Sequence, residues 1–237
     1  MAGHSKWANI KHKKERSDAK KGKIFSKIAK EIITAVKLGG PDPKGNPRLR
    51  LVLQKAKAAN MPNDNIERNI KKAASQDTAG YEECLYELYG HGGVGILVEA
   101  MTDNKNRTAS DLRIATNKKG GTIALSGSVS FNFEKKGVIH IKKDPKLQEK
   151  LFNCAIEHGA EDFDVEEDEF IILTPPESLY EVKEALETIT PIIDAELQWI
   201  CKNLIACNEE TQAKNMALID FLEDLDDVDN VYHNMEV

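Results

Sequence analysis

The sequence lacks any run of about 18 consecutive apolar residues, which is the length that a membrane-spanning helix needs. Its basic N-terminus is not followed by an apolar stretch, so the pattern of a secretory signal is absent. This end is rich in Lys rather than in Arg and Ser, which argues against a transit peptide. We therefore expect a soluble, cytoplasmic protein that has no membrane partner.

Cysteine is scarce and forms no C-x-x-C pair, so the spacing matches neither a zinc site nor a disulfide framework. We expect reduced, mostly buried thiols in a reducing compartment, and no metal. The cysteines are Cys84, Cys154, Cys201 and Cys207.

Catalytic motifs are also missing: there is no P-loop, no nucleophile elbow and no H-E-x-x-H. Residues 90–95 match G-x-G-x-x-G, but residues 96–98 predict a strand where a dinucleotide site needs a helix, so we favour a glycine-rich hairpin turn. The acidic run 224–229 lacks the glycine and the distal Glu of a calcium loop, and we interpret it as a solvated helix end. We expect no catalytic residues, no cofactor and no enzymatic activity.

Each end of the chain contains few charged residues of one sign. Residues 1–75 hold 19 Lys/Arg and 6 Asp/Glu, a net charge of +13, whereas residues 144–237 hold 5 and 25, a net charge of −20. The net charge of −6 for the whole chain hides this asymmetry. It predicts that the N-terminal end attracts polyanions and the C-terminal end repels them.

Helical spacing dominates the first 80 residues. Apolar residues recur on one face of 24–36, on one face of 49–56 and more weakly on 66–74. Glycines at 39 and 40 end the first helix, and Asn46 before Pro47 is a good start signal for the second. We predict a basic three-helix bundle over residues 1–80.

The rest of the chain predicts α+β structure. Residues 134–205 show the order β-α-β-β-α-β of a ferredoxin-like unit. Residues 81–133 lack a helix and a strand to complete a similar unit, and residues 206–237 supply one of each. The predicted fold is therefore multidomain: a helical bundle followed by two α+β ferredoxin-like domains, with 134–205 inserted into a discontinuous domain of 81–133 and 206–237.

The strongest binding candidate is the basic arm together with the first helix. Lysines on that helix fall at spacings of three and four residues, so they form one stripe opposite the apolar face, which could follow a row of phosphates. The bland alternative is a solvated face, and it is weakened because few acidic residues compensate these charges. The predicted nucleic-acid-binding residues are Lys6, Trp7, Lys11, His12, Lys13, Lys14, Arg16, Lys20, Lys23, Lys27, Lys30, Arg48 and Arg50.

Several motifs resemble those of the YebC family, and together they span essentially the whole chain. The most specific is the opening MAGHSKW at 1–7, followed by IKHK at 10–13. The other matching segments are 60–62, 89–93, 102–108, 127–129, 222–228 and 231–234. The resemblance implies three domains, the third inserted in the second, and a cytoplasmic transcriptional regulator that binds DNA. It also implies an alternative, since relatives in mitochondria are translational activators and some bacterial relatives act on ribosomes.

Two functional hypotheses stay open. The first is a DNA-binding transcriptional regulator whose basic bundle grips the phosphate backbone. The second is a ribosome-associated translation factor whose basic bundle grips ribosomal RNA by its shape and backbone. In either case the acidic C-terminal domains are expected to avoid nucleic acid and to recruit a protein partner.

Overall fold

The computed structural model describes residues 21–75 and 80–236. The chain groups into two compact units, Met1–Ser130 with Asn203–Val237, and Phe131–Lys202. No helix of the described residues is long and apolar enough to cross a membrane. Within the same residues, no group of three or more His, Cys, Asp or Glu side chains is placed to hold a metal ion.

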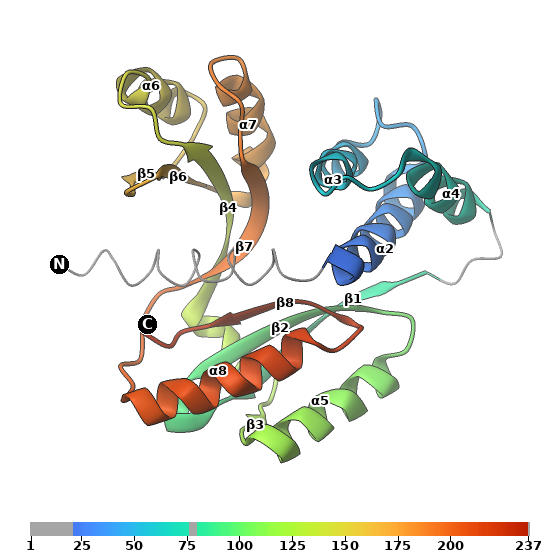
Figure 1. Cartoon of the computed structure of the whole chain (residues 1–237), viewed down its shortest axis with the longest axis vertical. Helices are drawn as coiled ribbons and strands as arrows, with labels where there is room; N and C mark the ends of the chain where they lie inside the picture. Colours follow the sequence, from blue (N-terminus) through green and yellow to red (C-terminus); the bar gives the residue numbers. More distant parts are fainter. Residues whose placement is uncertain (1–20, 76–79, 237) are drawn as a thin grey trace. The chain divides into compact units, whose positions relative to one another are not determined.

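Three helices form a bundle within residues 21–75: α2 (Lys21–Gly39), α3 (Pro47–Ala58) and α4 (Asn63–Ala74). The side chain of Asn46 accepts the backbone N–H of Leu49 at 3.0 Å, which caps α3 as its sequence predicts. Helix α2 packs against both other helices (Figure 1). Their shared apolar core contains Ile28, Ile32, Ile33, Val36, Leu49, Val52 and Ile66. The predicted helical bundle is confirmed.

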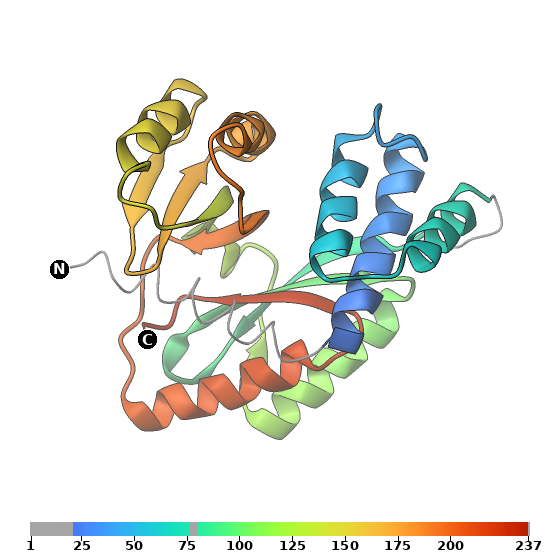
Figure 2. The same ribbon diagram turned by 45° about the horizontal axis from the view of Figure 1, so that its top comes forward.

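The first sheet has the strand order β3-β1-β2-β8 and is antiparallel throughout. Helices α5 and α8 pack against each other and lie side by side along one face of it (Figure 1, Figure 2). The last helix and strand, which follow the inserted unit in the chain, thus complete the sheet begun at residue 82. Its elements are β1 (Glu82–Tyr89), β2 (Gly95–Thr102), α5 (Lys105–Lys119), β3 (Thr122–Ile123), α8 (Glu209–Glu223) and β8 (Val228–His233).

The second sheet has the order β5-β6-β4-β7, and its elements follow the predicted β-α-β-β-α-β sequence. The fold class is confirmed. The compact unit Phe131–Lys202 lies within three residues of the predicted insertion at 134–205, and these domain boundaries stay a prediction. The elements are η2 (Ser130–Asn132), β4 (Phe133–Lys142), α6 (Gln148–Glu157), β5 (Asp162–Val165), β6 (Glu169–Thr174), η3 (Pro176–Ser178), α7 (Leu179–Glu187) and β7 (Asp194–Cys201).

The glycine-rich segment after β1 is a hairpin connection. A short helical turn, η1 (His91–Gly93), joins β1 to the antiparallel β2. Gly92 and Gly93 have φ angles of +69° and +79°, in the left-handed region that glycine enters without a steric penalty. A strand follows this turn, so the G-x-G-x-x-G match has no dinucleotide-binding context.

Candidate nucleic-acid interface

The predicted binding residues fall into two groups. Lys6, Trp7, Lys11, His12, Lys13, Lys14, Arg16 and Lys20 lie outside the described residues. Lys23, Lys27 and Lys30 lie on α2, and Arg48 and Arg50 on α3. For all of them, a role in nucleic-acid binding stays a prediction.

Three predicted lysines, Lys23, Lys27 and Lys30, occupy successive turns of α2, and we call them the lysine ladder. The Nζ atoms of Lys23 and Lys27 donate to the main-chain carbonyl oxygens of Glu223 and Asp229. All three side chains are half-buried. The sequence places this stripe on the solvated side of the helix, opposite its apolar face. In the structure the stripe lies against the first sheet instead.

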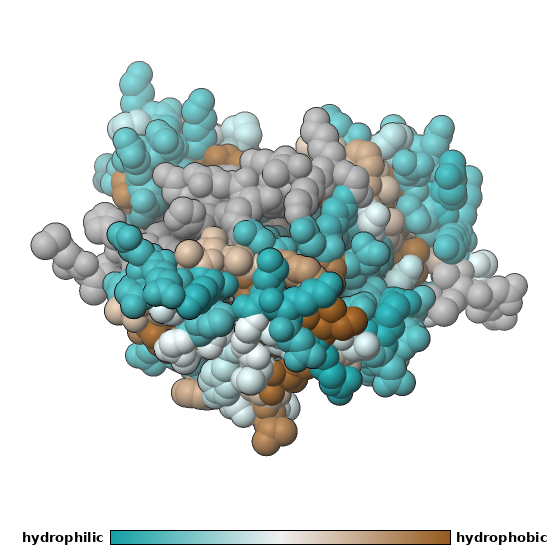
Figure 3. Space-filling model, turned by 60° about the horizontal axis from the view of Figure 1, so that its bottom comes forward, coloured by the Kyte–Doolittle hydropathy of each residue, from teal (hydrophilic) through white to brown (hydrophobic). Residues whose placement is uncertain are grey.

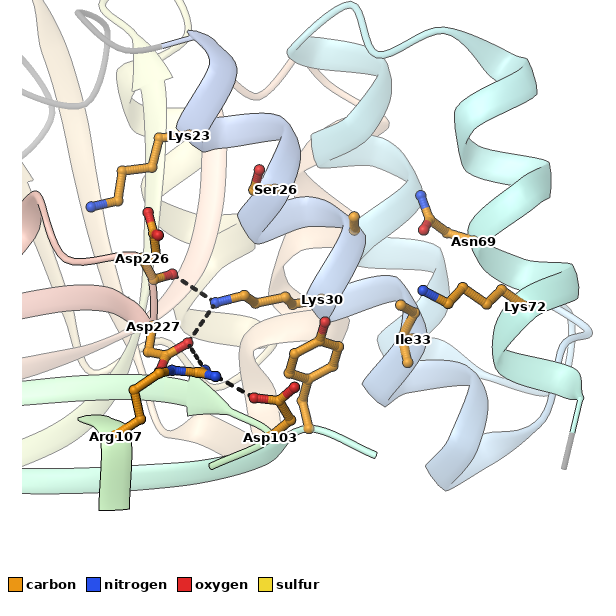
Figure 4. Close-up of a pocket in the computed structure, with 12 residues that line it drawn as sticks. Lys23, Ser26, Lys30, Ile33, Asn69, Lys72, Asp103, Arg107, Asp226 and Asp227 are labelled. Carbon is orange, nitrogen blue, oxygen red and sulfur yellow. Dashed lines mark hydrogen bonds and ion pairs between the residues drawn. The ribbon is translucent and has the colours of Figure 1, made fainter. Parts of the chain in front are cut away.

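Lys30 meets several acceptors at once. Its Nζ donates to the carbonyl oxygens of Asp226 at 2.7 Å and of Met101 at 3.1 Å, and it lies 3.5 Å from Oδ1 of Asp227. It also lies 5.7 Å from the ring centroid of Tyr81. A lysine ammonium has three donors, and these acceptors are enough to satisfy it. Lys30 therefore holds α2 against the turn between α8 and β8 (Figure 4).

A carbonyl oxygen at the end of α8 explains the position of Lys23. The last carbonyls of a helix have no intrahelical partner and carry the negative end of the helix dipole. Glu223 is the last residue of α8, and its carbonyl oxygen meets Lys23. Lys23 thus satisfies a main-chain acceptor that the helix leaves open, whereas Lys27 and Lys30 donate to carbonyl oxygens of β8 and of the turn before it.

Asp227 is the centre of this junction and is only 6% exposed. Its carboxylate accepts hydrogen bonds from the hydroxyls of Thr108 at 2.8 Å and Thr102 at 2.9 Å, and from Nη2 of Arg107 at 2.8 Å. Burial raises the pKa of Asp227, but hydrogen bonds from Arg107, Thr108 and Thr102 outweigh this effect and leave the pKa below its usual value. The interpretation of 224–229 as a solvated helix end is wrong at this residue. Two family-like segments, 102–108 and 222–228, meet here.

Asp229 lies in a different environment from Asp227. Its Oδ1 is buried and accepts no hydrogen bond within the described residues. Burial raises the pKa of Asp229 to about 7; nearby Lys27 lowers it, and Glu31 raises it further. The lysine ladder therefore packs beside one carboxylate that is held ionised and one that titrates near neutral pH.

The two predicted arginines of α3 are both partly engaged. Nη2 of Arg48 forms an ion pair with Glu83 of β1. Nη1 of Arg50 donates to the carbonyl oxygen of Lys44 at 3.4 Å. Both contacts are exposed, so solvent and salt weaken them and the guanidinium groups remain accessible to a competing anion.

Three exposed cations of the described bundle lie on α4: Arg68, Lys71 and Lys72. Lys71 forms an ion pair with Glu67 one turn earlier, with a separation of 3.7 Å and both side chains largely exposed. The sequence counts these residues in the basic charge but gives no reason to rank them first. The apolar periodicity of residues 66–74 is weak, so the sequence does not indicate that these three cations, rather than the lysine ladder, face solvent.

A cleft of about 670 Å³ lies between α2, α4 and the start of α5 (Figure 4). Lys72 extends from α4 towards Ile33 of α2 (Figure 4). Tyr81 lies beside Lys30, whose Nζ is 5.7 Å from the ring centroid. Asp226 and Asp227 close one end of it. The cleft is lined by Lys23, Ser26, Ala29, Lys30, Ile33, Asn69, Lys72, Tyr81, Asp103, Arg107, Asp226 and Asp227.

Another family-like segment, 127–129, has a structural role. The buried carboxylate of Glu87 accepts the backbone N–H groups of Gly127 at 2.7 Å, Val129 at 2.6 Å and Ser130 at 2.8 Å. Burial raises the pKa of Glu87, but these bonds outweigh the effect and lower it. The loop is held in place from within, although Leu125 beside it is 82% exposed.

The face of the molecule in Figure 3 is mainly hydrophilic, with hydrophobic residues in separate patches between. Single apolar residues are ordinary on a protein surface and by themselves mark no site. The polar cleft and the exposed cations of α4 therefore remain the features with a binding chemistry.

Comparison with known proteins gives matches over nearly the whole chain. Residues 5–76 match the TACO1/YebC protein N-terminal domain, and residues 81–235 match the TACO1/YebC second and third domain. A protein of Protochlamydia amoebophila named "Probable transcriptional regulatory protein" is 62% identical, covering 100% of this chain and 97% of the relative. One of the same name from Chlamydia pneumoniae is 57% identical, covering 99% and 100%.

A solved structure has the same fold. The crystal structure of a conserved hypothetical protein from Aquifex aeolicus superposes with a TM-score of 0.84 at 48% identity, covering 92% of this chain and 91% of that one. The predicted resemblance is confirmed: the chain belongs to the YebC family, and the two relatives above are named "Probable transcriptional regulatory protein".

Proposed function

We propose that this chain is a non-enzymatic regulator of transcription that binds DNA through its basic N-terminal region. The observation that carries the proposal is the net charge of +13 over residues 1–75, against −20 over residues 144–237. Phosphate contacts release counterions and supply most of the affinity of such proteins for nucleic acid. The names of the relatives support the same class of function.

The hydrogen bonds of the lysine ladder give its residues a different role from that of the other cations in the basic region. Lys23, Lys27 and Lys30 donate to carbonyl oxygens at the end of α8, in β8 and in the turn between them, so their main contribution is to hold the bundle in place. Phosphate binding then falls to the N-terminal arm, to Arg48 and Arg50, and to the exposed cations of α4.

Fluorescence anisotropy with the full chain and a duplex DNA tests this assignment. Arg68→Glu with Lys71→Glu should weaken binding about tenfold and lower the slope of log affinity against log salt by about 0.9 for each phosphate group that the variant no longer neutralises. The matched control is Lys146→Glu with Lys150→Glu, two exposed lysines of the acidic part. Equal reductions in affinity for both double variants would contradict binding through the bundle.

The alternative is a translation factor that binds ribosomal RNA. The same exposed cations would contact RNA phosphates, since this contact is independent of base sequence. Crosslinking in cells followed by sequencing of the attached nucleic acid separates the two. Recovery of chromosomal DNA supports the transcriptional role, whereas recovery of ribosomal RNA replaces it.

The acidic α+β part is proposed to recruit a protein partner with a basic surface. On α6, which also carries Glu149 and Glu157, Phe152 and Ile156 lie one turn apart and are 45% and 44% exposed, so they form an exposed apolar pair. Phe152→Ser with Ile156→Ser should leave DNA affinity unchanged and reduce regulation of a reporter gene in cells. Unchanged regulation would contradict this partner surface.

A further inference from the structure

We propose that the cleft between α2, α4 and the start of α5 binds one unpaired nucleotide of the nucleic acid that the basic region holds. The inference rests on the proposed function and adds a specific site to it. Its volume of about 670 Å³ falls within the range of roughly 300–1,000 Å³ that is typical of sites for small ligands.

The charges of the cleft favour an anion at one end. Asp227 is compensated by Arg107 and Lys30, and Asp103 is paired with Arg107 at 2.9 Å. The lining also includes the ammonium group of Lys72, whereas that of Lys23 already donates to the carbonyl oxygen of Glu223. Lys72 extends into the space from α4, where its charge can meet a phosphate group (Figure 4).

The remaining walls suit a nucleobase. Tyr81 supplies a half-buried aromatic ring, and Ala29 and Ile33 supply an apolar surface on α2. Base stacking on an aromatic side chain is favourable for every base, because each has a π-face. Asn69 and Asp226 place amide and carboxylate groups around the same space, where the polar edge of a base could find donors and acceptors. A base paired in a duplex cannot enter, so the nucleotide must be unpaired.

The chain offers a matched control for this site. Lys57 near the end of α3 and Lys72 on α4 are both exposed lysines of the same bundle. Lys72 lines the cleft, whereas Lys57 does not. A general electrostatic attraction would treat the two lysines alike, but a nucleotide held in the cleft would not.

The test uses the full chain and a single-stranded oligonucleotide that carries one 2-aminopurine, whose emission changes when it stacks. Lys72→Glu should weaken binding about tenfold and Lys57→Glu about twofold or less. Tyr81→Leu should abolish the emission change, and Tyr81→Phe should keep it. Folding of each variant is checked by circular dichroism and thermal unfolding.

The outcomes separate this inference from the proposed function. A large difference between the two lysine variants, together with an emission change that depends on the ring at position 81, supports the cleft. Normal binding by the wild-type chain with equal effects of Lys57→Glu and Lys72→Glu overturns the cleft and leaves the proposed function standing. A wild-type chain that binds neither duplex nor single-stranded oligonucleotides overturns both.

Discussion

Helices α2 and α4 carry lysines of the same charge in the same small bundle, yet the two sets meet different partners. Lys23, Lys27 and Lys30 of α2 end on main-chain carbonyl oxygens between residues 101 and 229. Lys71 of α4 is 80% exposed and pairs only weakly with its neighbour on the helix. A row of lysines on a helix can therefore either stabilise the packing of that helix or present charge to phosphates. The burial of the lysine side chains decides which.

The largest expected effect comes from reversing charge on the ladder. Lys27→Glu with Lys30→Glu would place two carboxylates against carbonyl oxygens and Asp227. Breaking a buried charge pair costs about 3–5 kcal/mol, so we expect a loss of stability of at least that size. The same reversal at Arg68 and Lys71 should cost less than about 0.5 kcal/mol per site, as exposed substitutions usually do. Urea unfolding of the two double variants measures the difference.

An equal and small effect in both double variants would mean that the ladder contributes no net stability to the junction. The comparison between the two helices would then fail at its first step, and the half-buried lysines would have to be counted again among the residues that bind phosphate.

The second prediction concerns the carboxylate at the centre of the junction. Asp227→Ala should destabilise the chain by about 2–4 kcal/mol, because it removes the acceptor of the buried Thr102 hydroxyl and takes one partner each from Thr108, Arg107 and Lys30. Asp226→Ala is the control: its side chain is exposed, and only its main-chain oxygen meets Lys30, so its effect should stay near zero. Similar losses of stability for both variants would show that Asp227 has no special role.

The sequence predicts the local structure well and the contacts between distant segments poorly. Asn46 before Pro47 and the apolar spacing along α2 are local signals, and both are confirmed. The order β-α-β-β-α-β of the inserted unit follows from the alternation of apolar periods, and it is also found.

The inward-facing ladder could not be predicted in this way. Lys23 and Glu223 are separated by 200 residues, and no local period records that they meet. The acidic run at 224–229 likewise gives no sign that Asp227 is buried while Asp226 is exposed. One usable signal is that two motifs, 102–108 and 222–228, each contain polar residues that could satisfy one another. The cleft is formed by three helices whose lining residues are distant in the sequence, so no local pattern predicts it.

The third prediction separates the two carboxylates beside the ladder by pH. Asp229 has a folded pKa of about 7, above its unfolded value, so its protonated form favours folding. Stability should therefore fall as pH rises from about 4 to 7, over the range between the unfolded and folded pKa values. Asp227 has a lowered pKa, and its contribution is present above the unfolded value and is lost only as pH falls below it.

Asp229→Asn should consequently stabilise the chain at pH 8, by about 1 kcal/mol or more, and have little effect at pH 4. Urea unfolding of the wild type and this variant across pH 4–8 measures the effect. A constant difference between the two proteins at every pH would show that Asp229 does not titrate in this range.

The smallest expected effect concerns Arg48, which lies on α3, the helix between α2 and α4 in the sequence. This predicted binding residue forms an exposed ion pair with Glu83, and such pairs contribute only about 0–1 kcal/mol to stability. Glu83→Gln should therefore change the free energy of unfolding by less than about 0.5 kcal/mol. It should also tighten binding to duplex DNA by about twofold, because it removes a carboxylate that competes with phosphate for the guanidinium group.

Glu82→Gln is the matched control, since Glu82 pairs with Lys105 of α5 rather than with the bundle. Anisotropy titrations at two salt concentrations decide the matter: a gain in affinity specific to Glu83→Gln that shrinks at higher salt places Arg48 among the residues that meet phosphate. A gain of the same size in both variants would reflect only the loss of one negative charge from the chain. Arg48 would then be excluded, like the lysine ladder, from the residues that contact phosphate.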